Sequence, residues 1–359
     1  MTIFGNHYAA CHMILPILAT LLMVLLMKDE FWTRGVLGLA KRMIIGVDIG
    51  GTTIKVALLD ELGNIIAKTQ IPTPVPEGED AIIHQMAATI DQLMEEHGFS
   101  KEETYGIGIG VPGPVDIETG FVYEAVNLGL KDTALKAKTE ALTGLPTYVE
   151  NDANAAALGE MWCGAGRGTD NLIAVTLGTG IGGGIIIDGK IVHGVKGVGG
   201  EIGHVTVNPD GPLCNCGKKG CIERYGSATA IILGLEKAVM EGRSMYLAKQ
   251  LAEKGSLTAK DAFDAAAEGD SAAQEVIDQA AFYTGFGLSH IANLLNPAKI
   301  VIGGGVSAAG DVLFKLIRKS FDTYTWKIAA ESCEILPATL GNDAGVIGAG
   351  WLVKQAQVM

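Results

Sequence analysis

Basic residues are scarce in this sequence. The chain of 359 residues has 27 lysines and arginines against 40 aspartates and glutamates, which gives a formal net charge of −13. A protein with this excess of negative charge repels polyanions. The sequence therefore disfavours a nucleic-acid backbone or an anionic membrane surface as a partner.

A disulfide framework is also missing. The chain has six cysteines, and three of them fall between residues 214 and 221. Secreted disulfide scaffolds are instead short and rich in cysteine throughout. The 49 glycines follow no collagen-like period, and the length suffices for two domains. We therefore expect a globular protein in a reducing compartment, the cytoplasm.

Long hydrophobic runs are missing as well. The uncharged run from Met13 to Met27 contains Pro16 and is shorter than the ~20 apolar residues that a membrane span usually needs. No Lys or Arg precedes the run and no small-residue cleavage site follows it, so a secretory signal is not indicated. For residues 1–42, a weak membrane anchor and a non-native or mis-assigned start are both open. We expect the fold to begin at Met43.

A compact cysteine and histidine motif is the most distinctive feature that is present. His204, Cys214, Cys216 and Cys221 fall within eighteen residues. Three thiolates and an imidazole at this spacing can form a tetrahedral shell around Zn²⁺, and nearby glycines let the loop fold back on itself. Disulfides or unrelated loop cysteines are the alternative, but a Cys-x-Cys pair has poor disulfide geometry. The spacing predicts a structural zinc site.

Two glutamates frame this motif. Glu201 precedes it and Glu223 follows it. Carboxylates held beside a rigid metal site suit a polyhydroxy ligand, because each can accept hydrogen bonds from neighbouring hydroxyl groups. The other interpretation is that both are solvated loop charges.

A glycine turn lies between two predicted strands near residue 50. The segment 44–60 is expected to form a strand, a tight turn and a second strand, and residues 63–64 the next hairpin turn. The backbone N–H groups of such a turn can bind phosphate, with Thr52, Thr53 and Lys55 as further donors. A strand follows the turn, so it is neither a Walker loop nor a dinucleotide fingerprint, in both of which a helix follows.

The same pattern occurs a second time, in residues 173–192. Aligned without a gap, Val47 matches Val175, Gly50 matches Gly178 and Asp60 matches Asp188. An internal repeat of this size predicts two related domains that face one cleft and grip a triphosphate from both sides. Two unrelated β-hairpins are the alternative.

A candidate general base lies between the repeats. Residues 146–149 are expected to form a strand, and the alanine run that follows predicts a helix. Asn151 and Asp152 therefore stand at a strand end, where Asp is also a good helix cap. The functional alternative is a carboxylate that accepts a proton from a hydroxyl group during phosphoryl transfer.

The remaining elements follow from periodicity. Helices are expected over 80–98, over most of 226–295 with a capping box at Thr258–Asp261, and over 344–355, which is expected to pack on the first domain. Residues 106–116 predict a strand that runs into a turn, and Asn127 lies in a further turn. Residues 299–303 predict a strand, followed by glycines 303–305 and a helix, where an adenosine could contact bare backbone.

Together these motifs resemble the ROK family of sugar kinases and related repressors, and within it the bacterial ATP-dependent glucokinases. The similarity covers residues 43 to about 355, and only the first 42 residues are foreign to it. It implies an actin/hexokinase-like α/β fold of duplicated ribonuclease-H-like domains, with an ATP and sugar cleft between them. We expect a small domain, 43–160, completed by the C-terminal helix 344–357. A large domain, 161–343, would contain the second phosphate loop, the zinc motif and the adenosine loop.

The resemblance also implies a role for each motif. Asp152 is the implied base, and the implied metal ligands are His204, Cys214, Cys216 and Cys221. The implied sugar-binding residues are Gly113, Asn127, Asn151, Asp152, Glu201, His204 and Glu223. The implied nucleotide-binding residues are Asp48, Gly50, Gly51, Thr52, Thr53, Lys55, Gly178, Thr179, Gly180, Gly303, Gly304 and Gly305.

The expected activity is ATP-dependent phosphorylation of glucose to glucose 6-phosphate by a homodimer or homotetramer. Asp152 would accept the proton of the sugar 6-hydroxyl, and Mg²⁺ near Asp48 would offset charge on the transferred group. Fructose, mannose and an N-acetylated amino sugar are the rival substrates. A sugar-responsive repressor would need a DNA-binding segment before the first glycine turn, and the 42 residues there are too few and too apolar.

Overall fold

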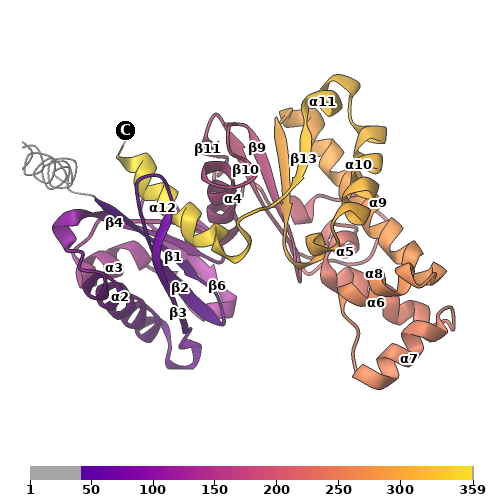
Figure 1. Ribbon diagram of the computed structural model, residues 1–359, viewed down its shortest axis with the longest axis horizontal. Coiled ribbons are helices and arrows are strands. Elements are labelled where there is room, and N and C mark those ends of the chain that lie inside the picture. Colours follow the sequence, from indigo (N-terminus) through magenta and orange to yellow (C-terminus); the bar gives the residue numbers. More distant parts are fainter. Residues whose placement is uncertain (1–41, 358–359) are drawn as a thin grey trace, which may run out of the picture. The chain divides into compact units, whose positions relative to one another are not determined.

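The computed structural model describes residues 42–357, and its first sheet has five strands in the order β3-β2-β1-β4-β8 (Figure 1). The strands are β1 (Met43–Ile49), β2 (Thr53–Leu59), β3 (Ile65–Pro72), β4 (Thr104–Val111) and β8 (Thr147–Asn151). β1, β2 and β3 pair antiparallel, whereas β1, β4 and β8 are parallel. The parallel strands bring their carboxyl ends to one edge of the sheet.

The second sheet repeats this order with later strands, β11-β10-β9-β12-β13. The strands are β9 (Leu172–Leu177), β10 (Ile181–Ile187), β11 (Lys190–Ile191), β12 (Lys299–Gly303) and β13 (Glu334–Pro337). The β9–β10 hairpin is antiparallel and β9, β12 and β13 are parallel, as are their counterparts in the first sheet. The predicted hairpin repeat is therefore confirmed in the structure. The boundaries of the two domains stay a prediction.

The ungapped alignment of the two hairpins is wrong for their second strands. In the first hairpin Ile49 pairs with Ile54, which leaves four residues in the turn. In the second hairpin Leu177 pairs with Ile181, which leaves three. The β10 register is therefore displaced by one residue relative to β2, so Asp60 and Asp188 are not equivalent. The sequence pattern could not reveal the shift, because glycines fill both turns.

A third, smaller sheet comprises β5 (Val115–Asp116), β6 (Phe121–Ala125) and β7 (Leu130–Thr133), in that order. The helices in the first half of the chain are α2 (Glu79–Glu96), α3 (Leu135–Thr143) and α4 (Asp152–Trp162). Those between the two parts of the second sheet are α5 (Glu223–Gly226), α6 (Ala228–Met240), α7 (Met245–Lys254), α8 (Ala259–Ala267) and α9 (Ser271–Leu295). The last are α10 (Asp311–Tyr324), α11 (Lys327–Ser332) and α12 (Ala344–Ala356).

The helical predictions are confirmed, including the capping box at Thr258. One detail differs: a short 3₁₀ turn (Gly305–Ala309) follows the glycines after β12, and the predicted helix starts only beyond Gly310. Among the described residues, no helix combines the length and the apolar composition that crossing a membrane requires. The apolar run at 13–27 lies outside the described residues.

Each five-stranded sheet has its own hydrophobic core. Val47 of β1 and Val56 of β2 are fully buried with Ile83, Met86 and Ile90 on one face of α2. Burying an aliphatic side chain of this size contributes about 1.5–3 kcal/mol. The core of the second sheet is formed with α6, α8, α9 and α10, as in the group Ile173, Leu235, Ala281 and Phe321.

Close glycine contacts fix α12 on the first sheet and on α4. A Cβ at Gly46 of β1 or Gly108 of β4 would lie 2.0 Å from Val346 O and 1.7 Å from Ala349 O respectively. A Cβ at Gly348 would lie 1.6 Å from Ala155 O of α4. Backbones can approach this closely only where side chains are missing. The last helix of the chain therefore covers the first sheet, as its sequence predicts.

Candidate functional site

Two carboxylates meet at the carboxyl edge of the first sheet. The strand register aligns Asp48 of β1 with Gly110 of β4 and Gly110 with Glu150 of β8. Asp152 follows directly as the first residue of α4, and a Cβ at Gly110 would lie 3.7 Å from its Cα atom. Crevices at the carboxyl ends of parallel strands are the usual ligand sites of α/β sheets.

Asp152 is held at this edge by its helix and not as the helix cap. The cap is Asn151, whose Oδ1 accepts hydrogen bonds from the N–H groups of Ala153 at 2.9 Å and Asn154 at 3.2 Å. Burial, and then the nearby charge of Asp48, raise the pKa of Asp152 above its usual value. A raised pKa makes the carboxylate a better proton acceptor near neutrality. Asn151 is therefore the helix cap, and Asp152 is the first residue of the helix.

Lys55 faces Asp48. Its Nζ lies 3.0 Å from Asp48 Oδ2 and donates to Asn342 O, also at 3.0 Å. Lys55 thus pairs with the carboxylate beside Asp152, and its predicted role as a phosphate donor stays a prediction. Lys55 and Asn342 are 287 residues apart in the chain, so the sequence could not predict their hydrogen bond.

The first glycine turn (Gly50–Thr53) is fixed through its carbonyl groups. Thr73 donates from Oγ1 to Gly50 O at 2.6 Å and from its N–H to Thr52 O at 3.0 Å. Within the described residues, no hydrogen bond uses the N–H groups of Gly51 and Thr52. The turn therefore leaves these two N–H groups free to donate to an anion, and their contact with phosphate stays a prediction.

The second glycine turn (Gly178–Gly180) is held in the same way by the start of α6. Ala228 N–H donates to Gly178 O at 2.8 Å, and Thr229 Oγ1 donates to Thr179 O at 2.7 Å. In the part of the chain that the structure describes, the N–H groups of Thr179 and Gly180 have no hydrogen-bond acceptor. In both turns the carbonyl groups therefore accept hydrogen bonds from the protein, while two N–H groups remain available to a ligand.

Glu223 lies against this second turn. Its Oε2 accepts the N–H of Ile181 at 3.0 Å, and a Cβ at Gly180 would lie 2.4 Å from that oxygen. Its Oε1 is 3.7 Å from the Sγ of Cys214. Glu223 therefore connects the cysteine motif to the second turn, and its predicted contact with sugar stays a prediction.

The glycines after β12 adjoin this turn and open a cavity of about 450 Å³. Gly304 has a positive φ of +86° and a Cβ there would lie 2.4 Å from Leu177 O, at the end of β9. The cavity is also lined by Thr176, Ser307, Asn342 and Glu160. Its position next to the second turn suits the adenosine part of a nucleotide.

Glu160 is a buried carboxylate near the end of α4, with a relative exposure of 3%. Its two oxygens accept the N–H groups of Ala165 at 2.9 Å, Leu340 at 2.8 Å and Thr339 at 3.1 Å. Residues 163–171 connect α4 to β9, and residues 338–343 connect β13 to α12. One side chain thus fastens both connections between the two sheets.

We expect Glu160→Gln to lower the free energy of unfolding by about 1–3 kcal/mol, because the amide nitrogen cannot accept any of these N–H groups. The melting temperature measures the loss. Glu253→Gln is the control, since Glu253 is exposed and only 3.8 Å from Lys249 in a surface ion pair that contributes little. Equal melting temperatures for both variants would contradict the role of Glu160.

The predicted sugar residues fall into two groups. In the first, Asn151 Nδ2 donates to Gly113 O at 3.2 Å, and Asn127 packs on the first glycine turn, where a Cβ at Gly51 would lie 3.3 Å from Asn127 O. In the second, Glu201 lies 4.0 Å from His204 Nε2. Asp152 belongs to the first group.

The predicted metal ligands do come together. One ligand atom from each of His204, Cys214, Cys216 and Cys221 lies within 4.8 Å of the others. Cys214 Sγ is 3.7 Å from His204 Nδ1, and Cys216 Sγ is 3.6 Å from Cys221 Sγ. Zn–S bonds of ~2.3 Å at tetrahedral angles give S–S distances of about 3.8 Å, so the residues fit zinc. The two cysteines are too far apart for a disulfide.

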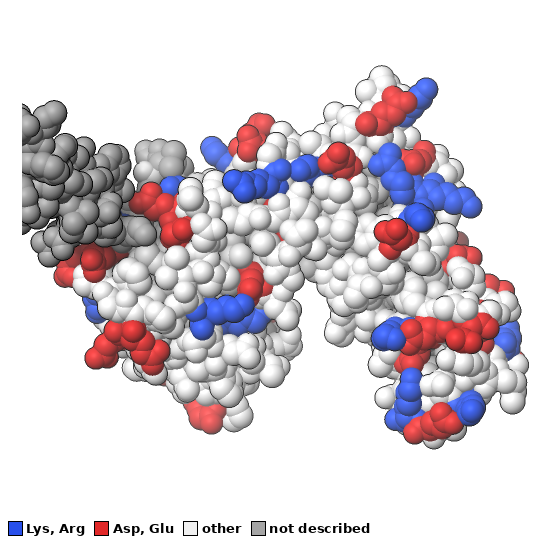
Figure 2. All heavy atoms as spheres, viewed as in Figure 1, with Lys and Arg blue, Asp and Glu red and all other residues white. Residues whose placement is uncertain are grey.

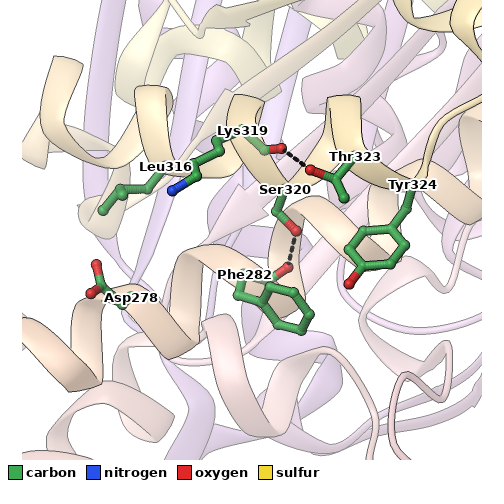
Figure 3. Close-up of a pocket in the computed structure, with 7 residues that line it drawn as sticks. All are labelled: Asp278, Phe282, Leu316, Lys319, Ser320, Thr323 and Tyr324. Atoms are coloured by element: carbon green, nitrogen blue, oxygen red, sulfur yellow. Dashed lines mark hydrogen bonds between the residues drawn. The ribbon is translucent and has the colours of Figure 1, made fainter.

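Another cavity, of about 360 Å³, lies on the helices α9 and α10 (Figure 3). It is lined by Asp278, Phe282, Leu316, Lys319, Ser320, Thr323 and Tyr324. Its hydroxyl groups bond to its own backbone: Ser320 donates to Phe282 O at 2.7 Å and Thr323 to Lys319 O at 2.8 Å. None of the predicted site residues lines it, so we assign no chemistry to it.

Charged groups form no extended basic surface on the face that Figure 2 shows, where acidic and basic side chains are interspersed over the described residues. The Lys and Arg residues visible there mostly lie beside Asp or Glu. This distribution agrees with the low content of basic residues in the sequence.

Comparison with known proteins decides the family. The model of the ROK family matches residues 44–356. The chain belongs to the ROK family. The glucokinase of Halalkalibacterium halodurans is 51% identical to it over 320 residues, which are 89% of this chain and 97% of that protein.

Two solved ROK structures share the architecture. A ROK family glucokinase from Streptomyces griseus in complex with glucose and AMPPNP is 39% identical, with a TM-score of 0.70 over 87% of this chain and 99% of that chain. A ROK hexokinase from Thermus thermophilus is 31% identical, with a TM-score of 0.76 over 88% and 99%. The expected actin/hexokinase-like α/β fold is confirmed.

Sequence reasoning missed four residues that hold the site in this ROK protein: Thr73, Glu150, Glu160 and His193. Thr73 fixes the first turn and Glu160 fastens the two connections. Glu150 and His193 bond to each other. Only Glu150 gave a signal in the sequence, as a charge at the end of an apolar strand, and its partner is 43 residues away.

Proposed function

We propose that this chain transfers the γ-phosphoryl group of ATP to the 6-hydroxyl of glucose, which yields glucose 6-phosphate and ADP. The observation that carries this proposal is the position of Asp152, a half-buried carboxylate with a raised pKa beside Asp48, in a chain that is 51% identical to a glucokinase. Phosphoryl transfer to an alcohol needs such a base, because the hydroxyl loses its proton as the new bond forms.

Asp152 accepts this proton as the sugar oxygen attacks the γ-phosphorus and ADP leaves. The N–H groups of the two glycine turns donate to phosphate oxygens and stabilise the charge that spreads over the transferred group. Asn151, Gly113 and Asn127 orient the sugar beside the base. Asp48, a half-buried carboxylate, suits Mg²⁺, which prefers oxygen ligands and offsets phosphate charge when bound.

His204, Glu201 and Glu223 complete the sugar contacts in this proposal. The three cysteines and the Nδ1 of His204, the ring nitrogen that faces Cys214, would hold the zinc. Such ligation would leave the His204 Nε2–H, 4.0 Å from Glu201, available to the sugar. We further propose one structural zinc per chain, a homodimeric or homotetrameric assembly and a cytoplasmic location.

An assay of ADP release against glucose, fructose, mannose and an N-acetylated amino sugar tests the proposed substrate. We expect the highest kcat/KM with glucose, and a product that a glucose 6-phosphate dehydrogenase oxidises. A higher kcat/KM with another hexose would reject glucose as the preferred substrate. A protein that releases no ADP with any hexose would reject the kinase.

The repressor alternative depends on residues 1–41, which lie outside the described residues. The two glycine turns with unused N–H groups, together with Asp152, support the enzyme, because a regulator needs no proton acceptor at the sugar. DNA binding without hexose phosphorylation would favour the regulator.

A further inference from the structure

A buried carboxylate outside the proposed chemistry links two parts of the sugar site. Glu150 is the second-last residue of β8, and its side chain has a relative exposure of 2%. Its Oε1 accepts the N–H of Asn151 at 2.9 Å and the Nδ2 of Asn154 at 3.0 Å. Burying a carboxylate is costly unless donors surround it, and these donors offset the cost at Glu150.

The remaining oxygen of Glu150 faces a histidine from the second half of the fold. Glu150 Oε2 lies 2.7 Å from the Nε2 of His193, which follows β11. The imidazole is about one third exposed. Since both oxygens of Glu150 are occupied by protein donors, the carboxylate is not a contact for sugar.

His193 begins a compact segment that leads to the second group of sugar residues. Gly199 N–H donates to His193 O at 2.7 Å and closes this segment, and Glu201 follows two residues later. A Cβ at Gly197 would lie 2.6 Å from Val115 O, so the segment also packs against β5, which follows Gly113 of the first group. Residues 193–204 are therefore connected to Asp152 by two hydrogen bonds of Glu150, one with His193 and one with the N–H of Asn151.

We propose that Glu150 and His193 are a positioning pair that sets Glu201 and His204 relative to Asn151 and Asp152. Glu150 holds the start of α4 with one oxygen and the 193–204 segment with the other. The pair thereby fixes the distance between the two halves of the sugar site. This inference rests on the proposed sugar kinase, because it concerns the same site.

Substitutions of His193 test the pair. We expect His193→Ala to raise the KM for glucose by about 10-fold, as for the loss of a hydrogen bond to a charged group, while the KM for ATP stays within about 2-fold. His193→Gln should restore most of the glucose affinity, because its amide nitrogen can donate from nearly the position of Nε2. If His193 had only a general structural role, His193→Ala would raise the KM for glucose and the KM for ATP together. His193→Gln would then restore neither constant.

A double-mutant cycle assigns the effect to the pair. We expect Glu150→Gln to raise the KM for glucose in the wild-type background and to have a smaller effect in the His193→Ala background, because the two residues act through one contact. His84→Ala is the matched control, since within residues 42–357 the one hydrogen bond of the His84 ring goes to Asp80 O of its own helix. Additive effects of the two substitutions, or an unchanged KM in His193→Ala, would overturn the proposal.

Limited proteolysis separates this inference from the proposed function. We expect faster cleavage within residues 193–200 in His193→Ala than in His193→Gln or His84→Ala, whatever sugar the protein uses. If the wild-type protein phosphorylates no hexose and this order still holds, the proposed function fails and the pair stands. Equal cleavage rates in an active kinase would overturn the pair alone.

Discussion

Asp152→Asn is expected to lower kcat for glucose phosphorylation by about 10²–10⁴, the usual contribution of a general base. The amide has nearly the size of the carboxylate and can still bond to a sugar hydroxyl, but it cannot accept the proton. The KM for glucose should therefore change little. Steady-state kinetics with glucose and ATP measure both constants.

Asn151 provides the control for this variant. Because Asn151 is the helix cap, Asn151→Ala should cost about 1 kcal/mol of stability, whereas Asp152→Asn leaves the cap intact. An Asp152→Asn protein with near wild-type turnover would contradict the assignment of the base. The family and the fold would be unaffected by that result.

The raised pKa of Asp152 adds a pH signature to the same variant. Wild-type activity should fall as the pH drops through this raised pKa. The residual activity of Asp152→Asn should not show this acidic decrease. A carboxyl whose folded pKa lies above its unfolded value of 3.8 opposes folding where it is ionised. Asp152→Asn should thus melt higher than the wild type at pH 7, and the difference should vanish below the unfolded pKa.

Cys216→Ala is expected to remove zinc and to raise the KM for glucose by at least 10-fold, on the order of the 10–100-fold effects seen when the surroundings of a metal are disturbed. Cys216 is one of four ligand residues within 4.8 Å, and the remaining three cannot complete the tetrahedral shell. Without the metal, His204 and Glu201 lose their fixed positions. Elemental analysis and glucose kinetics on one preparation measure both effects.

Cys163→Ala serves as the control because its thiol lies apart from this cluster, 3.4 Å from Leu62 O. It should keep both its zinc and its affinity for glucose. Fully active wild-type protein that contains no zinc would disprove the proposed site. Loss of zinc with an unchanged KM would restrict the metal to a structural role away from the sugar.

The sequence predicted those parts of the site that depend on local pattern. Glycines between apolar strands marked both turns, and the spacing of His204 and the cysteines marked the metal cluster, because a short loop allows few arrangements. The sequence could not decide between Asn151 and Asp152 as the helix cap, because the choice depends on the backbone angles in the structure. The pairing of Lys55 with Asn342 and of Glu150 with His193 needed tertiary contacts, since nothing local distinguishes a paired charge from a solvated one.

The glycine contacts of α12 have a consequence for biosynthesis. β1 is made at the start of the described chain and α12 at its end, yet Gly46 of β1 packs on the backbone of Val346. During translation, the face of the first sheet that packs on α12 therefore stays uncovered until all strands of the second sheet have been made. A chain released before residue 344 would carry that apolar face into solution, so nascent chains of this protein should need protection from aggregation until translation ends.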